Sequence, residues 1–408
     1  MKIAIIGAGP SGLSAAKNSI QEGHDVDVYE QTDRIGGTWV FTKEVGLDKY
    51  GLPIHTSMYE GLRTNLPKEL MEFENFSYPE NKTSFITQDT VIKYLDNYTN
   101  HFQLSKHIKF NHHVIKVDPL PDDKWNITSK NLIKNELQHK IYDAIIVCTG
   151  NFYTPFVPSI RGQKNFIGTS FHSHNYRHAD VFRNKRVVVL GAGPSGTGIS
   201  GLLSGVAKEV YISFSGSLLW AIPSSVIKKP RIALVKENSV QFSDGTEANV
   251  DAILYCTGYT TTFPFLSKET GIEVDDNWVK PLYKHIININ HPTMAIIGIT
   301  IRQCPFPLNE FQAKFFLAYI KGTFQKTKNE MWEEYNQEIM DLNMRGVQKK
   351  NYHLLGAQQG LYLDVLADTA NITRIKPVIH RLYMFQKSLP KTVSYKIINE
   401  NEFTYDEN

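Results

Sequence analysis

Short runs of consecutive apolar residues alternate with helical segments along the chain. The first run, Ile3–Ile6, leads into the glycine-rich turn Gly7–Gly12. A segment with helical periodicity follows, about Leu13–Glu22, and then a second strand, Asp25–Tyr29. A strand that is apolar without alternation is typical of a parallel sheet covered on both faces. The pattern therefore predicts an α/β fold that opens with strand, turn, helix and strand.

The same pattern occurs again in the middle of the chain. Arg186–Leu190 is the strand, Gly191–Gly196 repeats the first glycine-rich turn letter for letter, and Glu209–Ser213 is the next strand. One G-x-G-x-x-G match is weak, because many ordinary glycine turns fit it. Two copies with strands on both sides are specific for dinucleotide binding. We therefore expect two dinucleotide-binding sites.

Each residue of such a turn has a physical role. Gly7 permits the tight turn, Gly9 lets a pyrophosphate approach the backbone, and Gly12 lets helix and strand pack closely. The helix N-terminus offers free N–H groups to phosphates, and Glu30 can accept hydrogen bonds from ribose hydroxyls. The residues predicted to bind cofactor are Gly7, Gly9, Pro10, Ser11, Gly12 and Glu30 in the first site, and Gly191, Gly193, Pro194, Ser195 and Gly196 in the second.

Each half also closes on a similar strand. In both Tyr142–Gly150 and Val250–Gly258, an acidic residue precedes an apolar run that ends in Cys-Thr-Gly. A glycine there lets the chain turn close to a ligand, so Gly150, Thr257 and Gly258 are expected beside the cofactors. The three cysteines make no metal or C-x-x-C spacing, and we expect them to be small buried hydrophobes.

Two dinucleotide sites indicate hydride transfer between a flavin and a nicotinamide. Position and Glu30 assign FAD to the first site. The second site has no acid at Ile212–Ser215, where a carboxylate would repel a 2′-phosphate, so NADPH is expected there. The predicted architecture is α/β with two Rossmann-like domains, arranged as in glutathione reductase. Its parts are residues 1–156 (FAD domain), 157–275 (inserted NADPH domain) and 276–408 (FAD domain, second part).

Composition narrows the class further. The 408 residues carry a formal net charge of +3 and are 41% hydrophobic, which describes an ordinary folded protein without a basic surface for nucleic acid. The longest apolar runs, such as Met294–Ile301, fall far below the roughly 18 residues of a membrane span. We expect a soluble protein without a membrane anchor, cytoplasmic or, if a leader ahead of residue 1 was removed, secreted. The sequence leaves open whether it forms a homo-oligomer.

One motif points to a family. Phe166, Gly168, His172 and Tyr176 match F-x-G-x-x-x-H-x-x-x-Y/F, by which the chain resembles the flavin-containing monooxygenases. Further elements of that family are similar to Gly36–Trp39, Gly61–Glu69, Tyr255–Tyr259 and Pro305–Lys314. The resemblance covers residues 1 to about 322. Within the family, the chain is similar to the soluble insect enzymes that N-oxidise pyrrolizidine alkaloids.

The resemblance implies a reaction. NADPH would reduce FAD, O₂ would form a C4a-hydroperoxide on it, and its terminal oxygen would pass to a small molecule with an amine nitrogen or a sulfur. Asn65 matches the family's active-site asparagine, although an ordinary turn residue before Pro67 is the alternative. The other cofactor contacts implied are Gly37, Thr38, Trp39, Thr64, Tyr259 and Gln312. Trp39 is equally compatible with a core residue, and Arg302-Gln303 with either the flavin entrance or a surface loop.

The second site departs from the family pattern. Family members usually carry an arginine just after the second-site strand, to bind the 2′-phosphate, where this chain has Ser215-Gly216. Lys208 and Lys228 are the nearest basic residues, so the hydroxyls of Ser213 and Ser215 would bind the phosphate. Without a full charge, the preference for NADPH over NADH should be softer.

Other functions fit less well. A metal site at His172, His174 and His178 would have only Asp180 to join it, so no metal is expected. A flavin disulfide reductase needs a cysteine pair near the first site, and residues 1–147 contain no cysteine. A Baeyer–Villiger monooxygenase acting on ketones would carry tryptophan at Tyr176. A non-catalytic escort of prenylated proteins with an FAD-type fold would lack the turn Gly191–Gly196.

Overall fold

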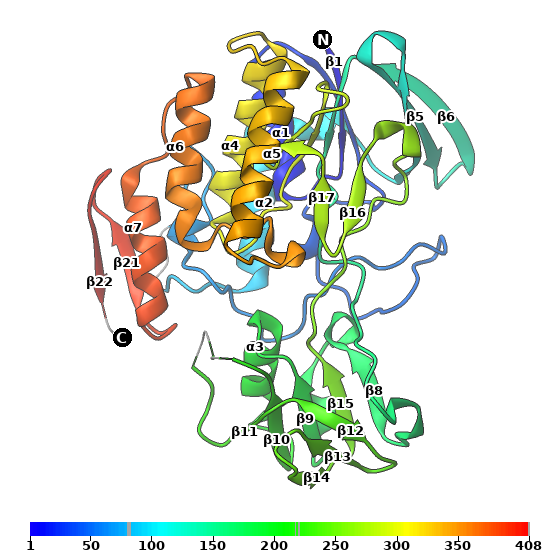
Figure 1. Cartoon of the computed structure of the whole chain (residues 1–408), viewed down its shortest axis with the longest axis vertical. Coiled ribbons are helices and arrows are strands. Elements are labelled where there is room, and N and C mark those ends of the chain that lie inside the picture. Colours follow the sequence, from blue (N-terminus) through cyan, green and yellow to red (C-terminus); the bar gives the residue numbers. More distant parts are fainter. Residues whose placement is uncertain (80–82, 217, 219–220, 407–408) are drawn as a thin grey trace.

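A computed structural model describes residues 1–79, 83–216, 218 and 221–406. The chain forms two bodies, one above the other in Figure 1. The larger body contains both ends of the chain, and the smaller body contains the middle of it. Each body is built around a sheet whose central strands are parallel, and each sheet lies against one of the glycine-rich turns; in the larger sheet the strands from residues 282–296 pair antiparallel with one another.

The larger sheet has seven strands in the order β18-β19-β20-β7-β1-β2-β3. Strands from residues 2–147 lie beside strands from residues 282–296, because β20 pairs in parallel with β7 through Met294↔Ile145. The central strands are apolar and buried on both faces, as expected for a parallel sheet. The strands are β1 (Lys2–Ile6), β2 (Asp25–Tyr29), β3 (Ile108–Lys109), β7 (Ala144–Val147), β18 (Leu282–Tyr283), β19 (Ile287–Asn288) and β20 (Met294–Ile296).

The smaller sheet repeats the centre of the larger one. Its order is β11-β10-β9-β15-β8, and β9 lies between β10 and β15 as β1 lies between β2 and β7. All its pairings are parallel. The strands are β8 (Thr169–His172), β9 (Arg186–Leu190), β10 (Glu209–Ser213), β11 (Ile227–Lys229) and β15 (Ala252–Tyr255).

Helices cover one face of the larger sheet and a small antiparallel sheet covers the other. The helix side forms an apolar core with β1, and the opposite core includes Trp125 and Tyr142. The helices are α1 (Pro10–Gln21), α2 (Gln88–His101), α3 (Pro194–Leu203, in the smaller body), α4 (Pro305–Ile320), α5 (Lys328–Met344), α6 (Gln359–Ala370) and α7 (Pro377–Phe385). The covering sheet is β4 (His112–Leu120), β5 (Lys124–Asn131) and β6 (Glu136–Tyr142).

Three further small sheets complete the chain. One lies in the smaller body, and the other two lie in the larger body, where β21 and β22 form a C-terminal hairpin beside α7 (Figure 1). Their strands are β12 (Ile232–Val235), β13 (Ser239–Phe242), β14 (Glu247–Asn249), β16 (Glu273–Asp275), β17 (Trp278–Lys280), β21 (Ser394–Ile397) and β22 (Phe403–Asp406).

Two neighbouring segments join the bodies. The outgoing segment hydrogen-bonds to the returning one where the N–H of Phe156 donates to the carbonyl of Gly258 (2.9 Å) and the N–H of Thr260 to that of Thr154 (2.8 Å). After this crossing, Phe263, Phe265 and Leu266 pack on the larger body. Residues 263–275, which the sequence analysis places in the NADPH domain, therefore lie on β4 and not on the smaller sheet.

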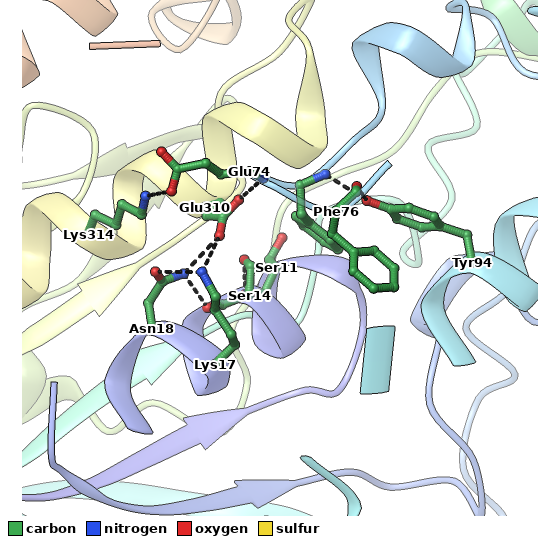
Figure 2. Close-up of polar contacts among 10 residues, drawn as sticks. Ser11, Ser14, Lys17, Asn18, Glu74, Phe76, Tyr94, Glu310 and Lys314 are labelled. Atoms are coloured by element: carbon green, nitrogen blue, oxygen red, sulfur yellow. Dashed lines mark hydrogen bonds and ion pairs between the residues drawn. The ribbon is translucent and has the colours of Figure 1, made fainter. Parts of the chain in front are cut away.

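A buried polar cluster fastens α1 to α4 (Figure 2). The ammonium of Lys17 lies 3.3 Å from Glu310 Oε1, and Asn18 donates to the same oxygen (3.1 Å). Glu310 Oε2 accepts from the backbone N–H of Glu74 (2.7 Å). Lys17 and Glu310 are only 7% and 2% exposed. Buried charges are tolerated only when they are paired and hydrogen-bonded. The cluster therefore fixes the position of α1, the helix that follows the first glycine-rich turn, against α4.

None of the helices among the described residues has the length and apolar character needed to span a membrane.

Candidate functional site: two glycine turns facing the strand ends

At two positions of each turn, the backbone conformation and its contacts permit only glycine. Gly7 and Gly191 have φ of +105° and +108°, in the region that favours glycine. A Cβ on Gly12 would lie 1.8 Å from the carbonyl oxygen of Gly7, and one on Gly196 would lie 1.9 Å from that of Gly191. Any side chain at Gly12 or Gly196 would therefore push the helix off its strand.

The middle glycine of each turn faces free space instead. A Cβ on Gly193 would meet no atom within 4 Å, and one on Gly9 would come only within 3.5 Å of Gly37. Both are the residues just before a helix, at Pro10 and Pro194, and no side chain caps either helix. Ser11 and Ser195 are the second residues of these helices. Uncapped N–H groups beside an open backbone are what a pyrophosphate requires, so both turns fit a dinucleotide.

Glu30 hydrogen-bonds to the backbone of the first glycine-rich turn. It is buried, its Oε2 accepts from the N–H of Ala8 (2.9 Å), and its Oε1 accepts from the N–H and hydroxyl of Thr32 (2.9 and 2.8 Å). A carboxylate has about four acceptor positions, so capacity remains for a ribose hydroxyl. Nearby, the buried hydroxyl of Thr149 has no hydrogen-bond partner among the described residues. That orphaned group also fits a bound polar ligand.

The second site contains an arginine that the sequence analysis missed. Arg231 donates through Nε to Ser215 Oγ (3.0 Å) from the segment after β11. The expectation that Lys208 and Lys228 are the nearest basic residues is therefore wrong. Ser213 is fully buried and donates its hydroxyl to the carbonyl of Pro230 (2.8 Å), so exposed Ser215 and Arg231 are the groups that a 2′-phosphate could meet.

The paired strand ends lie directly against the turns. A Cβ on Gly7 would lie 2.6 Å from the carbonyl oxygen of Cys148, and one on Gly191 2.3 Å from that of Cys256. Gly150 and Gly258 both have positive φ and open space around them. Cys148, Cys256 and the third cysteine, Cys304, are buried, as predicted, and burial raises the pKa of the Cys256 thiol to about 12.

The family motif begins inside the smaller body and ends at the junction of the two bodies. Phe166 and Gly168 precede β8, where a Cβ on Gly168 would lie 2.5 Å from the carbonyl oxygen of Asp251. Buried Tyr176 packs edge-on against Tyr59 of the larger body at 5.2 Å. His172 ends β8, and burial lowers its pKa to about 4.

The histidines of this segment bind protein groups. His172 Nδ1 accepts from the N–H of His174 (3.0 Å), and His174 Nε2 contacts the carbonyl of Ile54 (2.8 Å). Both rings pack edge-on to Tyr259, with centroids 5.2 and 5.8 Å away. Within the described ranges, no three His, Cys, Asp or Glu side chains gather as a metal site would require. Tyr259 and its neighbour Thr257, which donates to the carbonyl of Phe156, thus lie where the bodies meet.

Arg177 adds a contact that no motif indicated. Its guanidinium is buried and donates to the carbonyls of Glu44, Thr56, His174 and Tyr176. Two of these carbonyls belong to the larger body. An arginine that satisfies carbonyls on both sides fixes the orientation of the two sites.

Asn65 lies on the segment that faces the C-terminal hairpin. Its Oδ1 accepts from Lys391 Nζ (2.9 Å), and its amide N–H groups have no hydrogen-bond partner among the residues that the structure describes. The preceding Thr64 is buried, and its Oγ1 accepts from the N–H of Ile86 (3.2 Å). Lys391 thus determines which end of the Asn65 amide is available to a ligand.

The remaining predicted contacts lie around the first turn. Gln312 is fully buried on α4, where its Oε1 accepts from the N–H of Gly298 (3.2 Å) and its Nε2 donates to Tyr362 (2.9 Å). Both polar ends of Gln312 are thus bound within the protein. Trp39 packs edge-on to Phe306 and is half-buried, next to Thr38, whose carbonyl accepts from Thr56.

Comparison with known proteins places the chain in a family. The flavin-binding monooxygenase-like family model matches residues 1–226 and 218–405. Senecionine N-oxygenase of Tyria jacobaeae is 32% identical over 414 residues, 99% of this chain and 89% of that protein. The structure of S-allyl-L-cysteine S-oxygenase from Allium sativum is 32% identical, with a TM-score of 0.88 over 95% of this chain and 92% of that one.

The chain therefore belongs to the flavin-binding monooxygenase-like family. The predicted class, a flavin-dependent monooxygenase that uses FAD and NADPH, is confirmed, and so is the α/β fold with two dinucleotide-binding units. Cyclohexanone monooxygenase from Rhodococcus sp. Phi1, bound to NADP⁺, is only 15% identical, with a TM-score of 0.63 over 90% of this chain and 98% of that one. That similarity extends to the fold alone.

Proposed function

We propose that this monooxygenase oxygenates soft nucleophiles, foremost the nitrogen of tertiary amines and also thioether sulfur. FAD occupies the turn Gly7–Gly12, and NADPH the turn Gly191–Gly196. Residues 1–156 and 263–408 form the FAD unit, and residues 157–262 form the inserted NADPH unit. The observation that carries the proposal is the pair of open glycine turns, together with the side-chain amide of Asn65 on the larger body.

The roles of the residues follow from their contacts. FAD, when bound and reduced, supplies the activation of O₂. The free N–H groups at the starts of α1 and α3 bind the two pyrophosphates, and Glu30 binds the FAD ribose. Asn65 donates its amide N–H to the reacting oxygen, because Lys391 already occupies its carbonyl end. Arg177, by bridging the bodies, keeps the two cofactors at a constant separation and excludes water from the junction.

Relatives support the choice of nitrogen and sulfur over ketones. The two most informative ones are named for N-oxygenation and for S-oxygenation. Tyr176 is fully buried and packs against Tyr59. A larger tryptophan in place of Tyr176 would have to displace Tyr59.

Turnover of purified enzyme tests the proposal. A yellow protein should oxidise NADPH faster when trimethylamine or a methyl thioether is added, and mass spectrometry should find the amine oxide or sulfoxide with one added oxygen atom. Cyclohexanone is the matched control and should yield no lactone. A colourless preparation, or lactone as the only product, would contradict the proposal.

A further inference from the structure

The hydroxyl of Ser11 is bound by a side chain from a distant part of the chain. Ser11 is the second residue of α1, at the first glycine-rich turn, and its Oγ accepts a hydrogen bond from Asn309 Nδ2 (2.8 Å). Asn309 lies on α4 next to Glu310, which binds Lys17 farther along α1 (Figure 2). Helix α4 thus contacts α1 at two places, and the contact at the glycine-rich turn is made by neutral groups.

The direction of this hydrogen bond follows from a neighbouring amide. Gln303 is buried, and its amide lies 2.9 Å from the backbone carbonyl of Thr300, which can only accept, so Nε2 faces that carbonyl. Its Oε1 accepts from the Thr300 hydroxyl (2.9 Å). The same Nε2 lies 3.4 Å from Asn309, which must present its oxygen, Oδ1, to it. The nitrogen of the Asn309 amide, which can only donate, therefore faces Ser11.

Ser11 Oγ consequently acts as an acceptor toward α4, and its own hydrogen remains available. Among the described residues, this hydroxyl donates to no acceptor. The neighbouring Gly298 has a φ of +86°, and a Cβ there would lie 3.1 Å from Ser11 Oγ and 3.2 Å from Asn309 Nδ2, so a side chain would crowd the hydrogen bond. An O–H donor beside uncapped helix N–H groups suits phosphate oxygens, which can only accept.

We propose that Asn309 is a positioning residue for the flavin cofactor: it occupies the acceptor side of Ser11 Oγ, so that the Ser11 hydroxyl donates to the pyrophosphate of FAD. This inference rests on the proposed function, which places FAD at the turn Gly7–Gly12. The second turn has no such arrangement, because Ser195, at the matching place, receives no side-chain hydrogen bond within the part of the chain that the structure describes. Asn309 therefore acts on FAD and not on NADPH.

Reversing the hydrogen bond tests the inference. Asn309→Asp keeps the size of the side chain and its contact with Ser11, but an ionised carboxylate only accepts, so the Ser11 hydroxyl must donate to it. The pyrophosphate then loses that donor. Fluorescence titration of the apoenzyme with FAD at pH 8 measures the Kd. Ser11→Ala, which removes the same donor, should raise the Kd about tenfold, since a hydrogen bond to a charged group contributes that much or more.

A second background separates the hydroxyl from the added charge. In Ser11→Ala no hydroxyl remains to be redirected, so Asn309→Asp should raise the Kd there only through repulsion between its carboxylate and the phosphates. The rise that Asn309→Asp causes in wild type should therefore be about tenfold larger than the rise it causes in Ser11→Ala. Asn343→Asp makes the same chemical change on exposed α5 and should leave the Kd within twofold of wild type.

Each outcome decides the inference. Equal rises in the two backgrounds would show that Asn309 only tethers α1 to α4, because Asn309→Asp preserves that tether, and the inference fails. An unchanged Kd in Ser11→Ala overturns it whether or not the Asn309 variant folds. A wild-type enzyme that binds FAD but oxygenates neither trimethylamine nor a thioether would contradict the proposed function and leave the role of Asn309 in place.

Discussion

At the scale of single residues, the contact between Arg231 and Ser215 determines the expected cofactor preference. A guanidinium 3.0 Å from the Ser215 hydroxyl can bind the 2′-phosphate that distinguishes NADPH from NADH. Arg231→Gln should lower kcat/KM for NADPH about ten- to hundredfold, because a hydrogen bond to a charged group contributes about 1.5–3 kcal/mol. The value for NADH should not change.

Steady-state kinetics with both cofactors checks this prediction. Lys208→Gln is the control, since Lys208 is exposed and makes no ion pair within the described residues. An equal loss with NADPH and NADH would show that Arg231 merely supports the loop. A wild-type enzyme that uses NADH as well as NADPH would also contradict the assignment and would restore the softer preference predicted from the sequence.

Asn65 carries the second prediction at this scale. Asn65→Ala should retain FAD and its reduction by NADPH, because neither glycine turn is altered. It should lose about 3 kcal/mol, roughly a hundredfold, in the oxygen-transfer step that one preorganised donor stabilises. The variant should release hydrogen peroxide in place of oxygenated product. The ratio of peroxide to sulfoxide is the measurement, and a fully coupled variant would make Asn65 an ordinary turn residue.

At the scale of elements, α1 and α4 are joined by one buried and one exposed ion pair. Lys17→Met would leave Glu310 buried without its cation and should cost about 3–5 kcal/mol in the free energy of unfolding. The matched control joins the ends of the same helices: Lys321 and Glu22 are 58% and 41% exposed, and Lys321→Met should cost at most about 1 kcal/mol. Urea unfolding of the FAD-loaded enzyme measures both. Equal costs would show that burial of the first pair carries no penalty.

Local patterns predicted the two glycine-rich turns and the strands and helices around them, because the causes of these elements are local. The clash between Gly12 and the carbonyl of Gly7 arises within a single turn, so it leaves a readable motif. Arg231 and Lys391 left none, because they reach Ser215 and Asn65 only after distant segments pack together. The contacts of Gln312 with Gly298 and Tyr362 left no local pattern either, because they depend on the packing of the whole core.

At the scale of the whole molecule, acid should loosen the junction between the bodies. Burial lowers the pKa of His172 to about 4 and also lowers that of His174. The usual pKa of histidine is about 6.5, so between pH 6.5 and 4 the unfolded chain binds a proton at His172 that the folded chain does not. The free energy of unfolding should therefore fall by up to about 1.4 kcal/mol per pH unit on account of His172 as the pH drops through that window, and His174 acts in the same direction; above the window this stability is retained in full.

Denaturant unfolding at several pH values compares wild type with His172→Asn. Subtracting the two curves removes the contribution of the carboxylates, which titrate in both proteins. The variant should show the shallower decline below pH 6.5. Parallel curves would indicate that His172 takes up its proton without leaving its place beside Tyr259.

The pairing of β20 with β7 has a consequence for synthesis on the ribosome. About 150 residues separate these neighbouring strands, so at roughly 5–20 residues per second β7 waits on the order of ten seconds for its partner. During that interval the smaller body has already emerged and can complete its own sheet. The larger sheet meanwhile presents the open edge of an apolar strand, which is a template for aggregation. The nascent chain should therefore depend on chaperones at this stage more than the finished enzyme does.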